Sequence, residues 1–276
     1  MNALKFLGVL VFAACAYLRG PCAQSATAPW SLVVSTTTPV LSRWEGAVLE
    51  LRVQNVSGVV QELVPPLLVG GDREQWLRVT SPGGEARDIH AVVVREDISD
   101  GEPPVKILAG DSHVQVFVAA LDWSRCKPLF DAPGEYGLQV YFGGASSNSI
   151  SITCAPMSPA GAAKYAPLMS LEERGLLAAL YGGYLLDTPP FQGVEADLEA
   201  IALSPGGGWY RDYASLALGV ACVGRAEGAL EHAAVPAVAN SAKAWLARIA
   251  PTSPLTPIVV DVKKRLQAAE KKGSSD

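Results

Sequence analysis

Residues 47–55 read Ala-Val-Leu-Glu-Leu-Arg-Val-Gln-Asn, and this stretch decides the fold of the first half of the chain. From Val48 onward, leucine and valine alternate with acidic, basic and amide side chains. A period of two is typical of a β-strand that buries one face and exposes the other. The sequence therefore predicts a half-buried strand at this place.

Similar segments follow along the chain and are separated by short turns rich in Gly, Pro, Ser and Asp. Because no helical period lies between them, they favour an antiparallel β-sandwich of two sheets over an α/β fold. Prolines cannot donate to a central ladder, so the segment with Pro65 and Pro66 is expected at a sheet edge or broken in two. The further predicted strands cover residues 60–69, 75–79, 89–95, 113–121, 136–142 and 149–154.

Residues 130–140 read Phe-Asp-Ala-Pro-Gly-Glu-Tyr-Gly-Leu-Gln-Val. This motif resembles the penultimate strand of immunoglobulin-like domains, in which an Asp/Gly turn precedes a tyrosine at the corner of the sheet. Leu138 stands where antibody-type domains carry a cysteine, so the resemblance is to the looser class found in exported bacterial proteins. It implies an immunoglobulin-like β-sandwich over residues 30–155.

The second half of the chain changes to helical periods. Residues 156–168 are rich in Ala, Pro, Gly and Ser and are predicted to be a linker. Ser170 and Glu173 form a capping box that opens a predicted helix through Leu186. Short breaks between helices indicate antiparallel neighbours, so an all-α domain is expected over residues 169–272, with a disordered tail at 273–276. Further helices are predicted at residues 195–203, 209–223, 237–249 and 255–269.

Residues 210–219 read Tyr-Arg-Asp-Tyr-Ala-Ser-Leu-Ala-Leu-Gly, a mixture of small residues and aromatics. This stretch resembles tetratricopeptide-like helical hairpins, and the resemblance implies architecture alone. A clean repeat of about 34 residues is not visible. A helical-hairpin repeat and a plain helical bundle are therefore both open.

The first 25 residues have the three parts of an export signal. Lys5 precedes an apolar run at residues 6–18, and Ala23 and Ser25 supply small residues before a cleavage site. The run is shorter than the roughly 20 residues of a spanning helix. We therefore expect removal of residues 1–25 and export to the periplasm or beyond. The alternative is a lipid anchor at Cys15, because Phe-Ala-Ala-Cys resembles a bacterial lipobox.

The charge balance argues against a nucleic-acid partner. Loss of residues 1–25 would remove Lys5 and Arg19, leaving 20 basic against 27 acidic side chains and a net charge near −7. Proteins that bind nucleic acids need a basic face for the phosphates. No apolar stretch of spanning length follows residue 25, so no transmembrane segment is expected in the mature chain.

Three of the five cysteines lie beyond the export signal. Cys126 and Cys154 both fall in the strand-rich half, and export permits either a disulfide between them or two buried thiols. Cys222 has no histidine or other base near it in sequence, so it is interpreted as a core residue of a helix.

Motifs of catalysis, cofactor binding and metal binding are not recognisable, so the expected catalytic, cofactor and metal residues are none. The histidines do not fall at metal-ligand spacings. Glu195 and Glu199 share a helical face, but acidic residues are favoured at a helix start in any case. The acidic loop at 95–104 is interpreted as solvated rather than as a calcium site. The histidines are His90, His113 and His232, and the loop acids are Glu96, Asp97, Asp100 and Glu102.

These observations favour a non-enzymatic exported binding or scaffold protein of the bacterial cell envelope that acts through protein–protein contacts. Its partner is expected to be an unknown protein or glycan of the envelope. Two alternatives remain open. One is a hydrolase whose site is assembled from residues distant in sequence, and the other is a carbohydrate- or small-ligand-binding sandwich with an exposed row of Trp or Tyr.

Overall fold

The computed structural model describes residues 28–65, 67–68, 74–90, 104–123, 125, 127–156, 180–181, 183–187, 191, 193–205, 208–228 and 235–273. Several predicted features lie outside these residues: the export signal with Cys15, nearly all of the linker at 156–168, the capping box at Ser170, the acids of the loop at 95–104, Cys126, and His232. They stay predictions.

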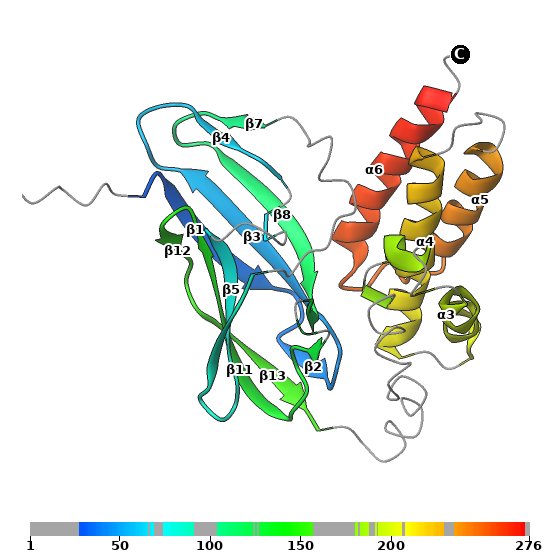
Figure 1. The fold of residues 1–276 in the computed structure, drawn as a ribbon, viewed down its shortest axis with the longest axis horizontal. Helices are drawn as coiled ribbons and strands as arrows, with labels where there is room; N and C mark the ends of the chain where they lie inside the picture. Colours follow the sequence, from blue (N-terminus) through cyan, green and yellow to red (C-terminus); the bar gives the residue numbers. More distant parts are fainter. Residues whose placement is uncertain are drawn as a thin grey trace, which may run out of the picture.

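The chain forms a β-rich first part over residues 30–155 and an all-α part over residues 194–272, as the sequence indicates (Figure 1). The strands are β1 (Trp30–Thr36), β2 (Val40–Ser42), β3 (Ala47–Asn55), β4 (Gln61–Leu63), β5 (Gln75–Thr80), β6 (Ala86–Ile89), β7 (Val105–Ile107), β8 (Ser112–Ala119), β9 (Leu121–Asp122), β10 (Lys127–Pro128), β11 (Gly134–Phe142), β12 (Ala145–Ser146) and β13 (Ile150–Ala155). A 3-10 helix, η2 (Gly183–Asp187), precedes four α-helices that lie wholly within the described residues: α3 (Val194–Leu203), α4 (Trp209–Glu227), α5 (Val235–Leu246) and α6 (Thr256–Gly273).

The strands belong to several sheets. One three-stranded sheet has the order β1-β3-β8, and the largest sheet has the order β2-β13-β11-β5-β6 with β12 beside β11. Two short sheets pair β9 with β10 and β4 with β7. The two larger sheets bury their facing leucines, valines and aromatics in one hydrophobic cluster, which includes Leu51, Leu77 and Tyr136. This cluster is the core of the β-rich part.

The prediction at residues 47–55 is confirmed. β3 is the central strand of its sheet and pairs antiparallel with β1 on one side and β8 on the other. The alternating Leu49, Leu51 and Val53 are fully buried, whereas Arg52 and Gln54 are exposed. The period of two in the sequence therefore corresponds to the two faces of this sheet.

Two details of the predicted strands were wrong. β2 and β13 pair in parallel, so the β-rich part is not wholly antiparallel. β1 was not predicted, because exposed Val33 interrupts the expected polar positions of its outer face. The strand expected at 89–95 shares only Ile89 with β6, and because residues 91–95 lie outside the described residues it stays a prediction.

The segment predicted as a strand at 60–69 ends at Leu63, before its prolines. Beyond them the chain turns inward, and Leu67 and Leu68 are buried. The amide of Gln115 accepts a hydrogen bond from the Leu67 N–H at 2.7 Å and donates one to its carbonyl at 3.2 Å. Gln75 accepts the Leu68 N–H at 2.8 Å. Side-chain amides thus replace the strand partners that this buried backbone lacks.

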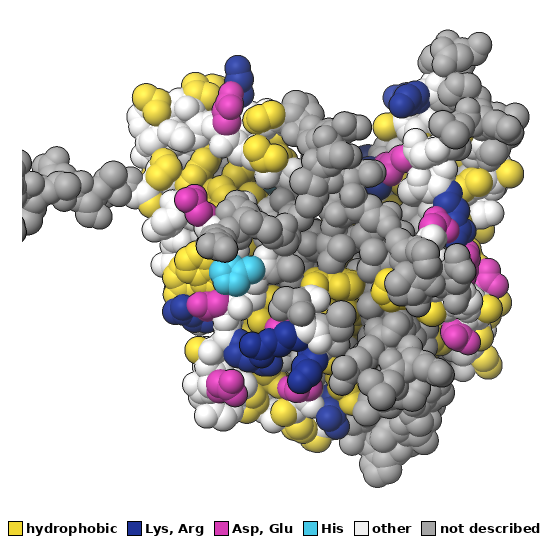
Figure 2. Space-filling model, viewed as in Figure 1, with side chains coloured by type: hydrophobic (Ala, Val, Ile, Leu, Met, Phe, Trp, Pro, Cys, Tyr) yellow, Lys and Arg dark blue, Asp and Glu magenta, His cyan; other side chains and the backbone are white. Residues whose placement is uncertain are grey.

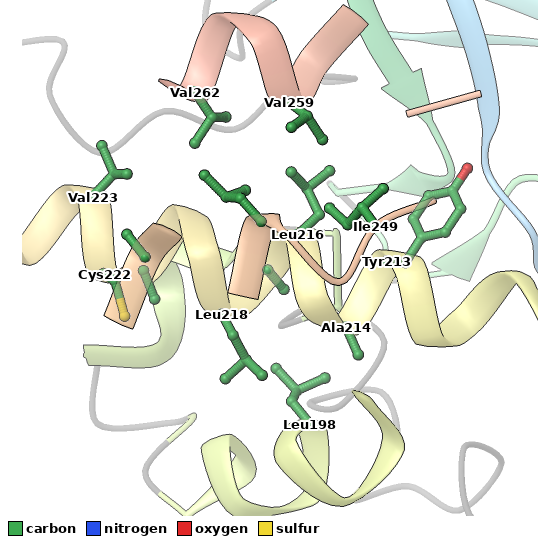
Figure 3. Close-up of a cluster of buried hydrophobic side chains, with 14 of the residues drawn as sticks. Leu198, Tyr213, Ala214, Leu216, Leu218, Cys222, Val223, Ile249, Val259 and Val262 are labelled. Carbon is green, nitrogen blue, oxygen red and sulfur yellow. The ribbon is translucent and has the colours of Figure 1, made fainter. Parts of the chain in front are cut away.

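The four helices begin and end close to their predicted places. α4 packs against η2, α3, α5 and α6, so it forms the centre of the helical part. Its buried side chains meet Leu198 of α3 on one side and Val259 and Val262 of α6 on another (Figure 3). Gly219 permits the approach of α5, because a methyl group there would lie 2.7 Å from a Leu246 methyl carbon. Burial of this apolar stripe is the main stabilisation of the helical part.

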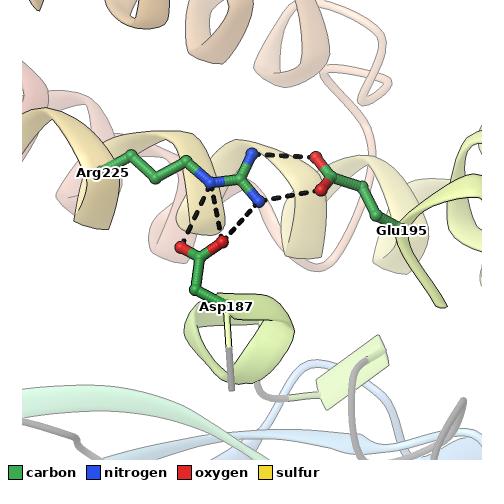
Figure 4. Close-up of polar contacts among 3 residues, drawn as sticks. All are labelled: Asp187, Glu195 and Arg225. Carbon is green, nitrogen blue, oxygen red and sulfur yellow. Dashed lines mark hydrogen bonds and ion pairs between the residues drawn. The ribbon is translucent and has the colours of Figure 1, made fainter. Parts of the chain in front are cut away.

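Arg225 ties the end of α4 to two other elements (Figure 4). Its guanidinium donates to both carboxylate oxygens of Asp187 at the end of η2, at 2.7 to 3.1 Å. It also donates to both oxygens of Glu195 in the first turn of α3, at 2.8 and 2.9 Å. The hydrogen bonds that Arg225 donates to Glu195 and Asp187 raise the pKa of its guanidinium above the ordinary value.

The two parts of the chain share one hydrophobic cluster. Trp44 and Val48 of the β-rich part belong to the same cluster as the buried side chains of the helices. The hydroxyl of Tyr213 donates to the Gly46 carbonyl at 2.8 Å, and that of Tyr181 donates to the Trp44 carbonyl at 2.6 Å. Two tyrosines from the second half of the chain therefore hold the turn between β2 and β3. We call residues 43–46 the junction turn.

Candidate interaction surface

β4 and β7 form a two-stranded ribbon at one end of the β-rich part. The pairs are Gln61 with Ile107, Glu62 with Lys106, and Leu63 with Val105. Leu63 and Ile107 are buried, so their face of the ribbon is the inner one. The outer face begins with Glu62 and Lys106, which are both exposed.

Apolar side chains flank these two charges. The same register continued by one residue places Val60 opposite Leu108 and Val64 opposite Pro104. Val60, Val64 and Leu108 are each more than half exposed, as are Val56 and Val59 in the turn before β4. In Figure 2, hydrophobic side chains gather over the end of the β-rich part that carries β4 and β7, around basic and acidic ones. We call the set Val60, Glu62, Val64, Pro104, Lys106 and Leu108 the ribbon surface.

A buried asparagine holds this ribbon in place. Asn55, at the end of β3, is fully buried. Its amide donates to the carbonyls of Val59 and Ile107 at 2.8 and 2.9 Å, and its oxygen accepts from the Ser57 N–H at 2.9 Å. Because one side chain bonds both β7 and the turn that leads into β4, the ribbon surface is connected to the central strand of the sheet.

The outer face of the β1-β3-β8 sheet changes character along its length. At one end, Val48 is buried and Val118 is partly buried against the helical cluster. At the other end, Val33 and Val114 lie on either side of Arg52 in the register, and all three are exposed. The helices therefore cover one end of this sheet face and leave further apolar side chains exposed at the other.

A row of aromatic and charged side chains lies on the face of the largest sheet. The rings of Trp76 and Tyr141 stack with centroids 4.9 Å apart, and His90 lies 5.8 Å from Trp76. The Arg78 guanidinium lies 4.9 Å from the Tyr141 ring and is held by Asp88 at 2.7 Å. The Tyr141 ring is therefore in contact with both Trp76 and Arg78.

Titratable groups with shifted pKa values gather around the junction turn. Glu45 accepts the Ser42 N–H at 2.8 Å, but burial raises the pKa of its carboxyl above the ordinary value of 4.5. Burial likewise raises the pKa of the Tyr213 hydroxyl and of the Cys154 thiol, and the charge of Glu45 adds to both shifts. Trp44 has a left-handed φ of 67°, which is strained for a bulky residue. Shifted pKa values and strain can mark functional sites, but here Trp44, Tyr213 and Cys154 are buried within the two hydrophobic clusters.

The structure separates most of the residues weighed in the sequence. Cys154 and Cys222 are buried, and because Cys126 lies outside the described residues its pairing with Cys154 stays a prediction. Both carboxylate oxygens of Glu195 accept hydrogen bonds from Arg225, so Glu195 does not form an acid/base pair with Glu199. His90 follows β6 and His113 lies on β8 of the other large sheet.

Within the part of the chain that the structure describes, no group of three or more His, Cys, Asp or Glu side chains is arranged to hold a metal ion. No helix in this part combines the length and the apolar character that crossing a membrane requires.

Comparisons with known proteins assign no family. No protein-family model matches the chain, and no curated protein sequence matches it. Among solved structures, it is similar to the alkylpurine DNA glycosylase AlkC of Pseudomonas fluorescens bound to DNA with an abasic site analog, at 14% identity and a TM-score of 0.30, over 46% of this chain and 31% of that chain. It is also similar to a β-glucosidase of Listeria innocua, at 11% identity and a TM-score of 0.27, over 46% and 16% of the two chains. The matched region is less than a third of either protein, and likeness this distant supports no activity.

The ribbon surface was missed by sequence reasoning. Val60 and Val64 were assigned to one longer strand, and residues 105–107 were assigned to no element. The local sequence gives no signal for it, because β4 and β7 pair across a long separation in sequence.

Proposed function

We propose that this chain is a non-enzymatic exported binding or scaffold protein of the bacterial cell envelope that contacts a partner protein through the ribbon surface. The observation that carries the proposal is the exposure of Val60, Val64 and Leu108 on a ribbon fixed by Asn55. Soluble proteins rarely keep a contiguous apolar patch in water without an interaction to cover it. Apolar side chains around a charged pair are the usual anatomy of a protein interface.

The shared core of the two parts supports the scaffold role. Tyr213 and Tyr181 bond the junction turn, and the helical cluster continues into Trp44. A rigid connection of this kind holds the helical part at a constant angle to whatever the ribbon surface binds. Residues 1–25 supply the export signal in this proposal, with the lipid anchor at Cys15 as the alternative.

We also propose an immunoglobulin-like β-sandwich for the β-rich part. The Tyr136 hydroxyl accepts the Ala132 N–H at 3.0 Å and lies 3.3 Å from an Asp131 carboxylate oxygen, which resembles the tyrosine corner of that class. For the helical part we favour a bundle over a tetratricopeptide-like repeat. The support is the central α4, which is surrounded by its neighbours.

The hydrolase alternative receives less support. Asp187 and Glu195 are a pair of carboxylates that meet from distant elements, as the two acids of a hydrolase would. All four of their oxygens accept hydrogen bonds from Arg225. A carboxylate held in this way is a poor general acid or base, because both of its oxygens already accept hydrogen bonds and are not free to exchange a proton with a substrate.

Site-specific photo-crosslinking in the producing cell tests the proposal. A photoreactive amino acid at Val60 is expected to yield adducts with a protein, because it would lie inside the contact. The same group at Val260, which is similarly exposed on α6, is the matched control and is expected to yield none. Equal labelling at both positions, or purified protein that turns over glycan or peptide substrates, would overturn the proposal.

A mass measurement of the mature N-terminus tests the export step separately. A chain that begins at Ala26 supports cleavage after Ser25, and a lipid-modified Cys15 supports the alternative. A chain that retains Lys5 and stays in the cytoplasm would overturn export.

A further inference from the structure

The ribbon surface has a pattern that a copy of itself can satisfy. Along the ribbon, the apolar pair Val60 and Leu108 is followed by the charged pair Glu62 and Lys106. The apolar pair Val64 and Pro104 comes next. The two residues of the middle pair have opposite charges and lie on neighbouring strands. Glu62 of one copy can therefore pair with Lys106 of a second copy, and the reverse.

Two copies can place their ribbon surfaces face to face about a two-fold axis in the plane of the contact, and this axis can run across the strands or along them. Only the axis along the strands is electrostatically favourable. An axis across the strands would place β4 on β4 of the second copy and bring the two Glu62 carboxylates together. An axis along the strands places β4 on β7 of the second copy. Glu62 then faces Lys106 of the second copy, and each apolar pair faces an apolar pair. Two-fold contacts are the commonest symmetric interfaces and need this kind of self-complementarity.

We propose that the ribbon surface binds a second copy of this chain, with the two-fold axis along the strands of the ribbon and Glu62 paired with Lys106 of the other copy. This inference rests on the proposed function, because it names the partner of the same surface. Opposite charges across the contact set its register, and the exposed valines and Leu108 supply the apolar area.

The size of the surface limits the affinity. A standard interface buries about 800 Å² on each partner, and six side chains on a two-stranded ribbon cover less than that. We therefore expect a weak, concentration-dependent dimer with a dissociation constant of about 1 μM to 1 mM. At the raised local concentration of a membrane-tethered or confined protein, a contact of this strength is occupied.

Charge exchange at the two central residues is the decisive experiment. Glu62→Lys gives a copy with two cations on its ribbon, and Lys106→Glu gives a copy with two anions. Each single variant places like charges together in its own dimer, so we expect at least about a tenfold weaker self-association by sedimentation velocity. In the equimolar mixture of the two variants every charge faces its opposite, and dimers are expected to return. Recovery in the mixture also shows that both variants are folded.

Two substitutions of apolar residues complete the test. Val60→Asp on the ribbon surface is expected to abolish the dimer, whereas Leu203→Asp, at an equally exposed position on α3, is expected to leave it unchanged. Wild-type protein that stays monomeric up to about 1 mM would overturn the proposal. A mixture that sediments like its components would overturn it too. Crosslinks from Val60 to a different protein in that case would leave the proposed function standing and replace its partner.

Discussion

The hydroxyl of Tyr213, in the first turns of α4, donates a 2.8 Å hydrogen bond to the carbonyl of Gly46 in the junction turn, and this contact joins the two parts of the chain across 167 positions. The bond is buried, and Tyr213 itself is 2% exposed. Without the Tyr213 hydroxyl, the Gly46 carbonyl would therefore lack a hydrogen-bond donor at a place that water cannot reach.

Tyr213→Phe keeps the ring and removes this donor. We expect a loss of about 2 kcal/mol in the free energy of unfolding, because an unsatisfied buried carbonyl retains its desolvation cost. Urea unfolding followed by circular dichroism measures it. Tyr181→Phe is the matched control, since its bond to Trp44 is only partly buried and water replaces it at lower cost. A loss for Tyr181→Phe as large as that for Tyr213→Phe would contradict this account.

Gly46→Ala tests the close approach at the same turn. A methyl group there would overlap the Val118 side chain and lie 2.9 Å from the Ala120 methyl. We expect the substitution to lower stability by about 2 kcal/mol through overpacking. Gly58→Ala, where a methyl group meets nothing within 4 Å, is the control and is expected to be neutral. Thermal unfolding of the two variants measures the difference. An unchanged melting temperature for Gly46→Ala would contradict the prediction and show that Val118 and Ala120 move to make room for the methyl group.

The elements that the sequence predicts well are those whose signal is local. β3 was predictable because leucine and valine alternate with polar residues along it. The apolar face is buried in the core and the polar residues Arg52 and Gln54 are exposed, as the alternation implies. The helices were predictable because glycine and proline separate them. Both signals depend on neighbours within a few residues.

The elements that were missed depend on contacts between distant residues. β4 and β7 are three residues long and pair across a long separation in sequence, as Gln61 with Ile107. Nothing near Val60 shows that its strand would pair away from the large sheets and leave it exposed. The parallel pairing of β2 with β13 and the burial of Glu45 beneath the helices are likewise set by tertiary packing, which overrides local preference.

Glu45 predicts a pH-dependent stability. Burial raises its folded-state pKa above the ordinary 4.5, so the folded protein holds the proton more tightly than the unfolded chain. Its contribution is fully present below pH 4.5 and is lost as the pH rises through the folded-state pKa. The charge of Glu45 acts on Tyr213 and Cys154, on which the charges of Arg43, Asp131 and Asp212 also act.

Glu45→Gln removes that dependence while keeping an acceptor for the Ser42 N–H. We therefore expect the variant to gain stability relative to wild type as the pH is raised from about 4 to about 8. Urea unfolding at both values measures the difference. Glu85→Gln, at an exposed turn, is the control and should show no such gain, because a carboxylate in water carries no burial penalty. A constant difference between Glu45→Gln and wild type would refute the role of burial.

Arg225→Lys tests the cluster at the end of α4. An ammonium cannot fork to both Asp187 and Glu195, so we expect a loss of about 1 kcal/mol at low salt, an amount kept small because all three side chains are about a third to a half exposed. The loss should shrink in about 1 M salt, which screens exposed charges. Arg265→Lys, at another exposed contact between a guanidinium and a carboxylate, is the control. A salt-independent loss would mean that Arg225 acts through packing.

Asn55→Asp tests whether one buried amide holds the ribbon surface. The carboxylate keeps the shape of the side chain but offers no donor to the carbonyls of Val59 and Ile107. We expect a loss of about 3 kcal/mol, because a buried charge then faces two acceptors, together with faster hydrogen exchange in β4 and β7. Asn148→Asp is the matched control: its amide bonds both backbone groups of Val34 in the same way but is exposed, so we expect a loss below about 1 kcal/mol. Slow exchange in β4 and β7 of the Asn55→Asp variant would show that packing of Leu63 and Ile107, rather than Asn55, holds the ribbon.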